Sequence, residues 1–508
     1  MGKERRPQKY SIPVIISTLS SILVISFAFI LFLLAKGYRV NLTDQTISKT
    51  GAISVKTYPT NALLYIDNKE MGRTPESRVL ETGRHSIRIE KEGFHYWEKE
   101  INIPEDKTTI ITPWLILEEN KKFTVWNSQK EAINFWVNEN EDIALILLKE
   151  PGEKYSLWKY KIERTMWEIL NNPMKIWESS DSNITLLLSP DGNYALLTTL
   201  TESGNASFLV NTSTTFTPAT NNKIELTGLE KSNIQWASDN KHILFDSVTS
   251  LLSYNITDRL MYTIFAKENT STNNIWTTTS DGFLYFVSEN SQPNETVYNY
   301  SIETVSLDGV KGEPILKNIY MQRDEKYIEY YRTQKNLFIP FTNSPENTQT
   351  VGTINAIQIN KQAKGILLSS TVASYWYSIS DSKYLTISHY PSKLLNFGGD
   401  GKRLMLETKE DLCVFTFDKE SLDHTEQIGL KIVPNIKTED KPRWISNSKH
   451  FSFVKDGVIN ISESDGENSV KTLSIDNINF FTIKKSRDNI LTFEKDEQGF
   501  FNINEYRL

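Results

Sequence analysis

The stretch "GRTPESRVLETGRHSIRIEKEGF", residues 72–94, combines turn residues, a proline and a strand-like run. In its second half, alternation places His85, Ile87 and Ile89 on one face of a predicted strand, because successive side chains of a strand point to opposite faces. Proline cannot donate to a strand ladder, so Pro75 marks a break in pairing before this strand. The stretch therefore predicts short antiparallel strands joined by tight turns.

The same pattern continues on both sides of this stretch. "AISVKT" alternates Ile53 and Val55 on one side of a strand, and "LLYID" resumes a strand after the turn residues "YPTNA". Gly72 and Gly83 permit the positive φ of tight turns. We therefore predict a small, strand-rich module over residues 52–117.

Two segments carry a resemblance to a known family. "YPTNALLYIDNKEMGRTP" and "LETGRHSIRIEKEGFHYWEKEINI" resemble the PEGA domain, a small β-sandwich of bacterial and archaeal surface proteins, over Ala52–Leu117. The namesake tetrapeptide of the family corresponds to Pro59, Thr60, Asn61 and Ala62, of which only the first and last letters are kept. The resemblance implies a prokaryotic cell envelope.

Composition narrows the class of protein. The chain has 508 residues, 39% hydrophobic content and a formal net charge of −7, which predicts several folded units and no nucleic-acid partner. The single cysteine, Cys413, lies in "DLCVFTFD" on the same face as Phe415 and Phe417, so we interpret it as a buried core thiol.

A long apolar segment lies near the N-terminus. Ile12–Ala35 carries no charge, and as a helix it would be ~36 Å long against a bilayer core of ~30 Å. A cleavable signal peptide would have a shorter apolar region and a small-x-small site, so we predict a signal-anchor helix. Four basic residues precede the segment, and fewer basic residues lie immediately after it. This charge difference predicts a cytoplasmic N-terminus and an extracytoplasmic remainder of the chain. These basic residues are Lys3, Arg5, Arg6 and Lys9.

The remainder of the chain repeats a strand, a polar turn and a second apolar strand. The turns recur mostly at about 40 to 55 residues, a period typical of four-stranded propeller blades. Through "LSPDGNYALL", Leu188–Leu197, the repeats resemble TolB-like and WD-like β-propellers. We predict about eight blades, with "KFTVWN" completing the last blade at "FFNINEY". Seven is the alternative, because Val372–Pro391 fits the repeat poorly.

The predicted fold class is therefore mainly β, with an N-terminal transmembrane helix, a small PEGA β-sandwich and a β-propeller. The predicted division is a basic cytoplasmic N-terminus at 1–11, a transmembrane helix at 12–35, a tether at 36–51, a PEGA-like sandwich at 52–118 and a propeller at 119–508.

The search for chemistry gives no catalytic, cofactor-binding or metal-ligating residue. His85 and His95 lack further ligands at metal-site spacing. His242 and His450 occupy equivalent places in the repeat. The acidic segment Ser462–Ser469 lacks the ligand order of a Ca²⁺ loop. The aspartates that precede glycines are interpreted as turn formers: Asp191, Asp281, Asp400 and Asp465.

Two functions remain open. The first is a non-enzymatic, envelope-anchored binding or scaffold protein that contacts a protein or a glycan, with no cofactor. The second is an extracytoplasmic hydrolase whose carboxylates lie in propeller loops. Loops on a rigid scaffold commonly carry binding, so the polar segments Asn211–Lys223 and Thr342–Gly352 are candidate contacts for a partner.

Overall fold

A computed structural model describes most of the chain. The described residues are 12–35, 38–41, 46–152, 154–163, 173–180, 184–201, 204–214, 223–226, 233–247, 249–267, 275–290, 297–322, 353–360, 364–379, 383–388, 391–399, 401–408, 411–416, 429–446, 449–474, 478–484 and 489–508. They divide into two compact units, and the chain passes from the first to the second between Glu118 and Glu119.

The first unit begins with helix α1, Ile12–Ala35. Between Ile16 and Phe32 all its large apolar side chains are at least half exposed. Within the described part of the chain, we find no helix with both the length and the apolar character needed to cross a membrane. The predicted transmembrane span is therefore not confirmed.

Residues 36–51, predicted as a tether, contain strand β1, Tyr38–Asn41, and the first half of β2, Thr46–Val55. The two strands pair antiparallel, with Tyr38 opposite Lys49. The prediction was wrong here because this polar segment lacks a hydrophobic period of its own and is ordered by pairing with a strand that continues into the sandwich.

The rest of the first unit is a sandwich of two sheets. One sheet pairs β2 with β5, Glu76–Glu81, and in parallel with β8, Thr108–Ile111. The other has the order β4-β3-β6-β7. Its strands are β3 (Leu63–Ile66), β4 (Lys69–Arg73), β6 (Gly83–Glu90) and β7 (Trp97–Ile103).

The sandwich core confirms the predicted alternation. Ile53 and Val55 from β2 are fully buried against Ile87 and Ile89 from β6 within one apolar cluster. The two predicted turn glycines have φ values of 121° at Gly72 and 131° at Gly83, which side chains with a Cβ rarely adopt. Local pattern thus determines this unit well.

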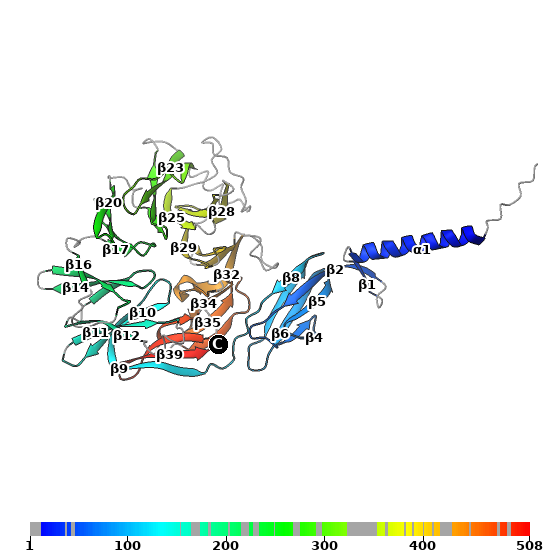
Figure 1. The fold of residues 1–508 in the computed structure, drawn as a ribbon, viewed down its shortest axis with the longest axis horizontal. Helices are drawn as coiled ribbons and strands as arrows, with labels where there is room; N and C mark the ends of the chain where they lie inside the picture. Colours follow the sequence, from blue (N-terminus) through cyan, green and yellow to red (C-terminus); the bar gives the residue numbers. More distant parts are fainter. Residues whose placement is uncertain are drawn as a thin grey trace, which may run out of the picture. The chain divides into compact units, whose positions relative to one another are not determined.

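The second unit consists of successive four-stranded antiparallel sheets. In Figure 1 these sheets follow one another around a ring, and the last, red, lies next to the first, cyan. Among the described residues there are eight sheets when the two halves of β9, Lys122–Val137, are counted in the first and the last. Val372–Pro391, which fits the repeat poorly, contributes β27 and β28 to the fifth sheet.

The strands of the eight sheets follow in chain order. The first four sheets contain β9 with β10–β12 (Ile143–Glu150, Lys154–Lys161, Met174–Ser179), β13–β16 (Ile184–Leu188, Tyr194–Thr201, Gly204–Asn211, Lys223–Leu226), β17–β20 (Asn233–Trp236, His242–Asp246, Ser250–Asn255, Leu260–Ala266) and β21–β24 (Trp276–Thr279, Phe283–Glu289, Val297–Ser306, Leu316–Gln322). The last four contain β25–β28 (Ile354–Asn360, Gly365–Ser370, Ser374–Ser378, Lys383–Ser388), β29–β32 (Ser392–Phe397, Arg403–Thr408, Asp411–Thr416, Gly429–Lys437), β33–β36 (Arg443–Trp444, His450–Lys455, Val458–Glu463, Val470–Ser474) and β37–β39 with β9 (Ile478–Ile483, Asn489–Lys495, Phe500–Arg507). A short 3₁₀ helix, η5, spans Thr438–Asp440.

The second sheet is covered on both faces by its neighbours. On β14, Ala195 and Leu197 pack into a cluster shared with the first sheet, whereas Leu196 packs into a cluster shared with the third. Strands covered on both faces need apolar residues at consecutive positions, which explains the continuous run "ALL" of this repeat. A single sheet could not bury both faces alone.

Strand β9 closes the ring. Its first half pairs with β39, with Trp126 opposite Ile503, and its second half pairs with β10, with Val137 opposite Ala144. The predicted completion of the last sheet by "KFTVWN" is therefore confirmed. Lys122 Nζ donates to Glu494 Oε2 at 2.9 Å and fixes the start of this strand against β38.

We expect this closing strand to contribute to stability through packing. Trp126 packs partly buried against the cluster of the first and last sheets, so Trp126→Ala should lower the free energy of unfolding by about 2–3 kcal/mol. Phe123 lies in the same half-strand but is 57% exposed, so Phe123→Ala should cost less than about 1 kcal/mol. Urea unfolding of both variants checks this. Equal losses would show that the closing strand is not packed as described.

Candidate functional site

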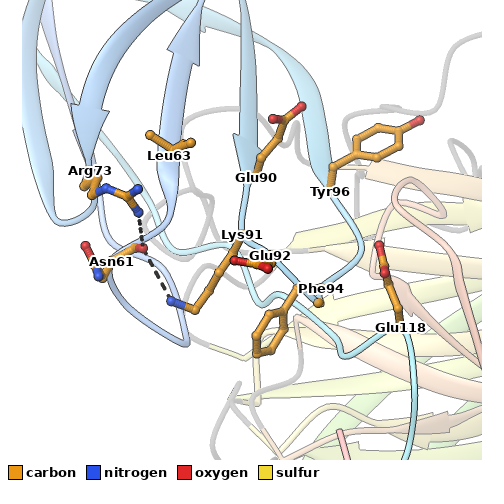
Figure 2. Close-up of a pocket in the computed structure, with 10 residues that line it drawn as sticks. Asn61, Leu63, Arg73, Glu90, Lys91, Glu92, Phe94, Tyr96 and Glu118 are labelled. Carbon is orange, nitrogen blue, oxygen red and sulfur yellow. Dashed lines mark hydrogen bonds between the residues drawn. The ribbon is translucent and has the colours of Figure 1, made fainter.

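A pocket of about 640 Å³ opens in the sandwich of the first unit (Figure 2). Its walls come from the loop before β3, from β4, from the end of β6, and from the loop between β6 and β7. The lining residues are Asn61, Leu63, Arg73, Glu90, Lys91, Glu92, Gly93, Phe94, Tyr96 and Glu118.

The loop that carries Asn61 is held by two buried threonines. The hydroxyls of Thr57 and Thr74 lie 2.5 Å apart, and the Thr74 hydroxyl also accepts a hydrogen bond from the backbone N–H of Ala62 at 3.1 Å. The backbone N–H of Asn61 donates to the Thr74 carbonyl at 2.9 Å. The segment that corresponds to the family's namesake tetrapeptide is therefore fixed to the chain just after β4.

Two cations hold the same loop from the pocket side. Lys91 Nζ donates to the carbonyl oxygens of Thr60 at 2.9 Å and Asn61 at 3.4 Å. Arg73 Nη1 donates to the Asn61 carbonyl at 3.2 Å, so both side chains converge on one oxygen, as Figure 2 shows. This wall of the pocket is preorganised, because both its backbone and its charged side chains are restrained.

The opposite wall is the turn between β6 and β7. The backbone N–H of Phe94 donates to the Lys91 carbonyl at 3.0 Å, which closes the turn, and Gly93 has the positive φ of 79° that this turn requires. The backbone N–H of Glu118 donates to the Gly93 carbonyl at 3.0 Å. The turn is thereby tied to the end of the unit.

The rim of the pocket combines one exposed aromatic ring with carboxylates. Tyr96 is 61% exposed, and the Arg88 guanidinium carbon lies 5.1 Å from its ring centroid. Arg88 also forms an ion pair with Glu90. Within the described part of the chain, the carboxylates of Glu92 and Glu118 have no ion-pair partner and accept no hydrogen bond. These groups are free to contact a ligand.

Of the two histidines considered as metal ligands, His85 has other hydrogen-bonding partners. The His95 side chain has no partner among the described residues. His85 lies with Asp67 Oδ2 at 2.7 Å from Nδ1 and with the Glu81 carbonyl at 2.9 Å from Nε2. Burial raises the pKa of Asp67, but the hydrogen bonds from His85 and the Ser86 backbone lower it further, so the pKa lies below its ordinary value. No group of three metal-ligating side chains occurs among the described residues.

The aspartates interpreted as turn formers have that role where the structure describes them. Asp191 Oδ1 accepts from the backbone N–H of Asn193, and Asp465 Oδ1 accepts from that of Glu467, each at 3.0 Å. Asp281 accepts from the Thr279 hydroxyl. Asp400 lies outside the described residues, as do Thr342–Gly352 and most of Asn211–Lys223, so the predicted partner loops stay predictions.

Cys413 is a core residue, as predicted. Its side chain is fully buried in β31, and burial raises the pKa of the thiol to about 11. A thiol with this pKa is almost entirely protonated at neutral pH, so it is a poor nucleophile.

The sequence did not reveal a charge cluster around His242, in which His242 and Asp239 are buried and Asp308 is half exposed. His242 Nδ1 lies 2.6 Å from Asp239 Oδ2, and Nε2 lies 2.9 Å from Asp308 Oδ1 in the next sheet. Asn255 Nδ2 also donates to Asp308, at 3.1 Å. Asp239 beside a histidine resembles the carboxylate that orients a catalytic histidine, but here Nε2 already faces a second carboxylate instead of a nucleophile. The cluster joins two sheets.

The pKa values of this cluster depend on these contacts. Burial lowers the pKa of His242, but the hydrogen bonds to Asp239 and Asp308 raise it above its ordinary value. Burial raises the pKa of Asp239 and of Asp308, and hydrogen bonds from His242 bring both below their ordinary values. An imidazolium between two carboxylates is therefore the favoured form of the cluster.

Comparison with known proteins gives one family match and distant structural neighbours. Residues 50–115 match the PEGA domain, which confirms the resemblance of the first unit. A search of curated proteins gives no match. Solved structures with a similar arrangement include an oligogalacturonate lyase in complex with manganese (10% identity, TM-score 0.36, 77% of this chain and 98% of that chain).

Two further solved structures are distant neighbours. A eukaryotic initiation factor has 11% identity and a TM-score of 0.41 over 73% of this chain and 83% of that chain. The β-propeller domain of Cps50 (Swd1) from Myceliophteria thermophila has 9% identity and a TM-score of 0.32 over 76% of this chain and 100% of that chain. At these identities and TM-scores, the neighbours give no information about the activity of this chain.

The charge cluster predicts how stability depends on pH. Because the pKa of His242 is raised, its contribution is complete below the ordinary value of 6.5 and is lost as the pH rises through the folded value. The lowered pKa values of Asp239 and Asp308 make their contribution complete above the ordinary value of 3.8. The cluster should thus stabilise the second unit most between these two limits.

We expect His242→Gln to lower the free energy of unfolding by about 2 kcal/mol near pH 6, because it leaves the buried Asp239 without its charged partner. The loss should shrink towards about pH 9, as the pH rises through the raised pKa of the native histidine. Urea unfolding across this pH range measures both effects, with His95→Gln in the first unit as the control. A loss for His242→Gln that is the same at both ends of the range would contradict the cluster's role.

Proposed function

We propose that the chain is a non-enzymatic binding or scaffold protein of the cell envelope. In this proposal its PEGA-like sandwich and its propeller-like unit lie outside the cytoplasmic membrane and contact a protein or a glycan. The single observation that carries the proposal is the preorganised pocket of the sandwich, which combines two restrained cations with carboxylates that have no partner among the described residues.

The geometry of the pocket favours binding over catalysis. Lys91 and Arg73 both donate to the backbone carbonyl of Asn61, so both side chains are restrained and stabilise this wall of the pocket. Proton transfer requires an acid or base whose pKa is matched to the task and whose partner lies in reach. The charged groups with shifted pKa values in the second unit, such as Asp239 and Glu494, are already engaged by neighbouring side chains. The hydrolase alternative therefore gains no specific support.

Membrane attachment through α1 is part of this proposal. The segment is uncharged over Ile12–Ala35 and follows four basic residues, a pattern that favours a cytoplasmic N-terminus. Its exposed apolar side chains, from Ile16 to Phe32, need cover from lipid or protein, because water solvates such a surface poorly. A lipid bilayer is the cover that suits a helix apolar on all sides.

The binding role is testable with matched lysine variants. Lys91→Ala removes the side chain that holds the loop at Asn61, whereas Lys107→Ala removes an exposed lysine from elsewhere in the same unit. We expect the chain, purified in detergent and immobilised, to retain a protein or glycan component of the envelope, and Lys91→Ala to retain about tenfold less. Lys107→Ala should behave as the native chain. Retention that is equal in all three chains, or absent from the native chain, would reject the pocket as the binding site.

The proposed topology has its own test. Protease added to intact spheroplasts should digest both units, because the proposal places everything after α1 outside the cytoplasmic membrane. A cytoplasmic protein of the same cells serves as the control for membrane integrity. Survival of a fragment that contains both units, while added external proteins are digested, would exclude this topology.

A further inference from the structure

We propose that the pocket of the sandwich binds an uncharged, hydroxyl-rich glycan segment, with Tyr96 as the ring on which one sugar packs. This inference rests on the proposed binding function and names the class of ligand for the same site. It is carried by three features of the pocket: its mixed charge, its hydrogen-bond donors and acceptors, and its exposed aromatic ring.

The charges of the pocket disfavour ionic ligands of either sign. A polyanion would meet the carboxylates of Glu90, Glu92 and Glu118, whereas a polycation would meet Arg73 and Lys91. Repulsion between like charges a few ångströms apart persists at a partly desolvated site, where screening by water is reduced. A neutral ligand meets neither penalty.

The hydrogen-bonding groups of the pocket suit hydroxyls. Arg73 uses Nη1 on the Asn61 carbonyl, and its other N–H groups make no hydrogen bond within the described part of the chain, so they can serve a ligand. Glu92 and Glu118 provide acceptor oxygens only. Each sugar hydroxyl both donates and accepts, so one sugar can satisfy a guanidinium on one side and a carboxylate on the other. Bonds of this kind that involve a charged group are stronger than neutral ones.

Tyr96 provides the apolar contact that such a ligand needs. Its ring is 61% exposed, and the Arg88 guanidinium lies 5.1 Å from the ring centroid. Figure 2 shows Tyr96 extending from the rim, separate from the bonded group of Asn61, Arg73 and Lys91. An aromatic side chain combines a large apolar face with a polar tip, so the C–H face of a sugar can pack on the ring while its hydroxyls reach the polar groups.

The pocket also has a suitable size and rigidity. Its volume of about 640 Å³ lies within the range of ~300 to 1,000 Å³ that ligand pockets typically have. The loop at Asn61 is fixed on both sides by hydrogen bonds from Thr74 and Lys91. Because little ordering is needed on binding, modest contacts can give measurable affinity.

The experiment is calorimetric titration of the chain in detergent with three glycan groups. The neutral group contains hexamers of β-1,4-glucose, α-1,4-glucose and N-acetylglucosamine, together with the neutral polysaccharide fraction of the envelope. The cationic group is the de-acetylated glucosamine hexamer, and the anionic group is a galacturonate hexamer. We expect binding of at least one neutral glycan and at least tenfold weaker binding of both charged hexamers.

Variants at the ring make the test specific. Tyr96→Ala should weaken binding of the neutral glycan by about tenfold, whereas Tyr96→Phe, which keeps the ring, should change it by less than about threefold. Tyr58→Phe is the control at an exposed tyrosine of the same unit outside the pocket. A neutral glycan that binds Tyr96→Ala as well as the native chain would overturn the assignment of the ring.

The remaining outcomes separate this inference from the proposed function. If only a charged hexamer binds, the ligand class is wrong. If no glycan binds but the chain retains an envelope protein in a manner that depends on Lys91, the glycan inference is wrong and the binding function stands. If neither glycan nor protein is retained through the pocket, both fail.

Discussion

The second unit depends on one strand that serves two sheets. Sheets arranged around a ring bury both faces only against neighbours, so the first and last sheets must meet. Strand β9 achieves this, because its first half is the outer strand of the last sheet and its second half is the inner strand of the first. Without that first half, β39 would be an edge with unpaired backbone groups, and the cluster that contains Phe501 and Ile503 would lose part of its cover. Every other sheet is built from consecutive strands, so this closure is where the ring is most vulnerable.

Hydrogen bonds between turns connect successive sheets, even though the repeats are degenerate in sequence. Asn138 Nδ2 donates to the Pro190 carbonyl in the next sheet at 2.7 Å, and the backbone N–H of Asp191 donates to Asn240 Oδ1 in the following one at 2.8 Å. His242 and Asp308 also link two successive sheets, with charges instead of amides, although Asp308 lies in the turn between β23 and β24. What recurs is therefore the position of a short polar side chain in the turn, which several residue types can fill. This explains why one repeat resembles a known motif closely while the others do not.

Features that depend on local pattern could be predicted from the sequence, and those that depend on distant partners could not. The alternation at Ile53 and Val55 follows from periodicity that is visible within a few residues. The closing strand at residues 122–127 follows from the repeat, because the last repeat needs one more strand to be complete. The pairing of β1 with β2 could not be predicted in this way, because the polar segment around β1 has no hydrophobic period and forms a strand only by pairing with β2. Asp67, the partner of His85, is 18 residues away in the sequence, and Asp308, the partner of His242 in the next sheet, is 66 residues away. Neither pair can therefore be recognised from the spacing of residues along the chain. The pocket has the same origin, because its charged residues individually resemble an ordinary solvated surface.

The departure from the family's namesake tetrapeptide has a structural explanation. Its letters stand for Pro, Glu, Gly and Ala, so the glycine corresponds to Asn61, which has a φ of 64°. Asparagine is among the few residues other than glycine that adopt this left-handed conformation readily, so the turn survives the substitution. Lys91 and Arg73 bind the backbone carbonyls of Thr60 and Asn61, and any residue type provides those oxygens. The loop can therefore vary Thr60, and can vary position 61 among the few residue types that adopt a positive φ, while it keeps the wall of the pocket. Because Asn61 lines the pocket and Thr60 does not, position 61 is the one through which such a change could alter what the pocket binds.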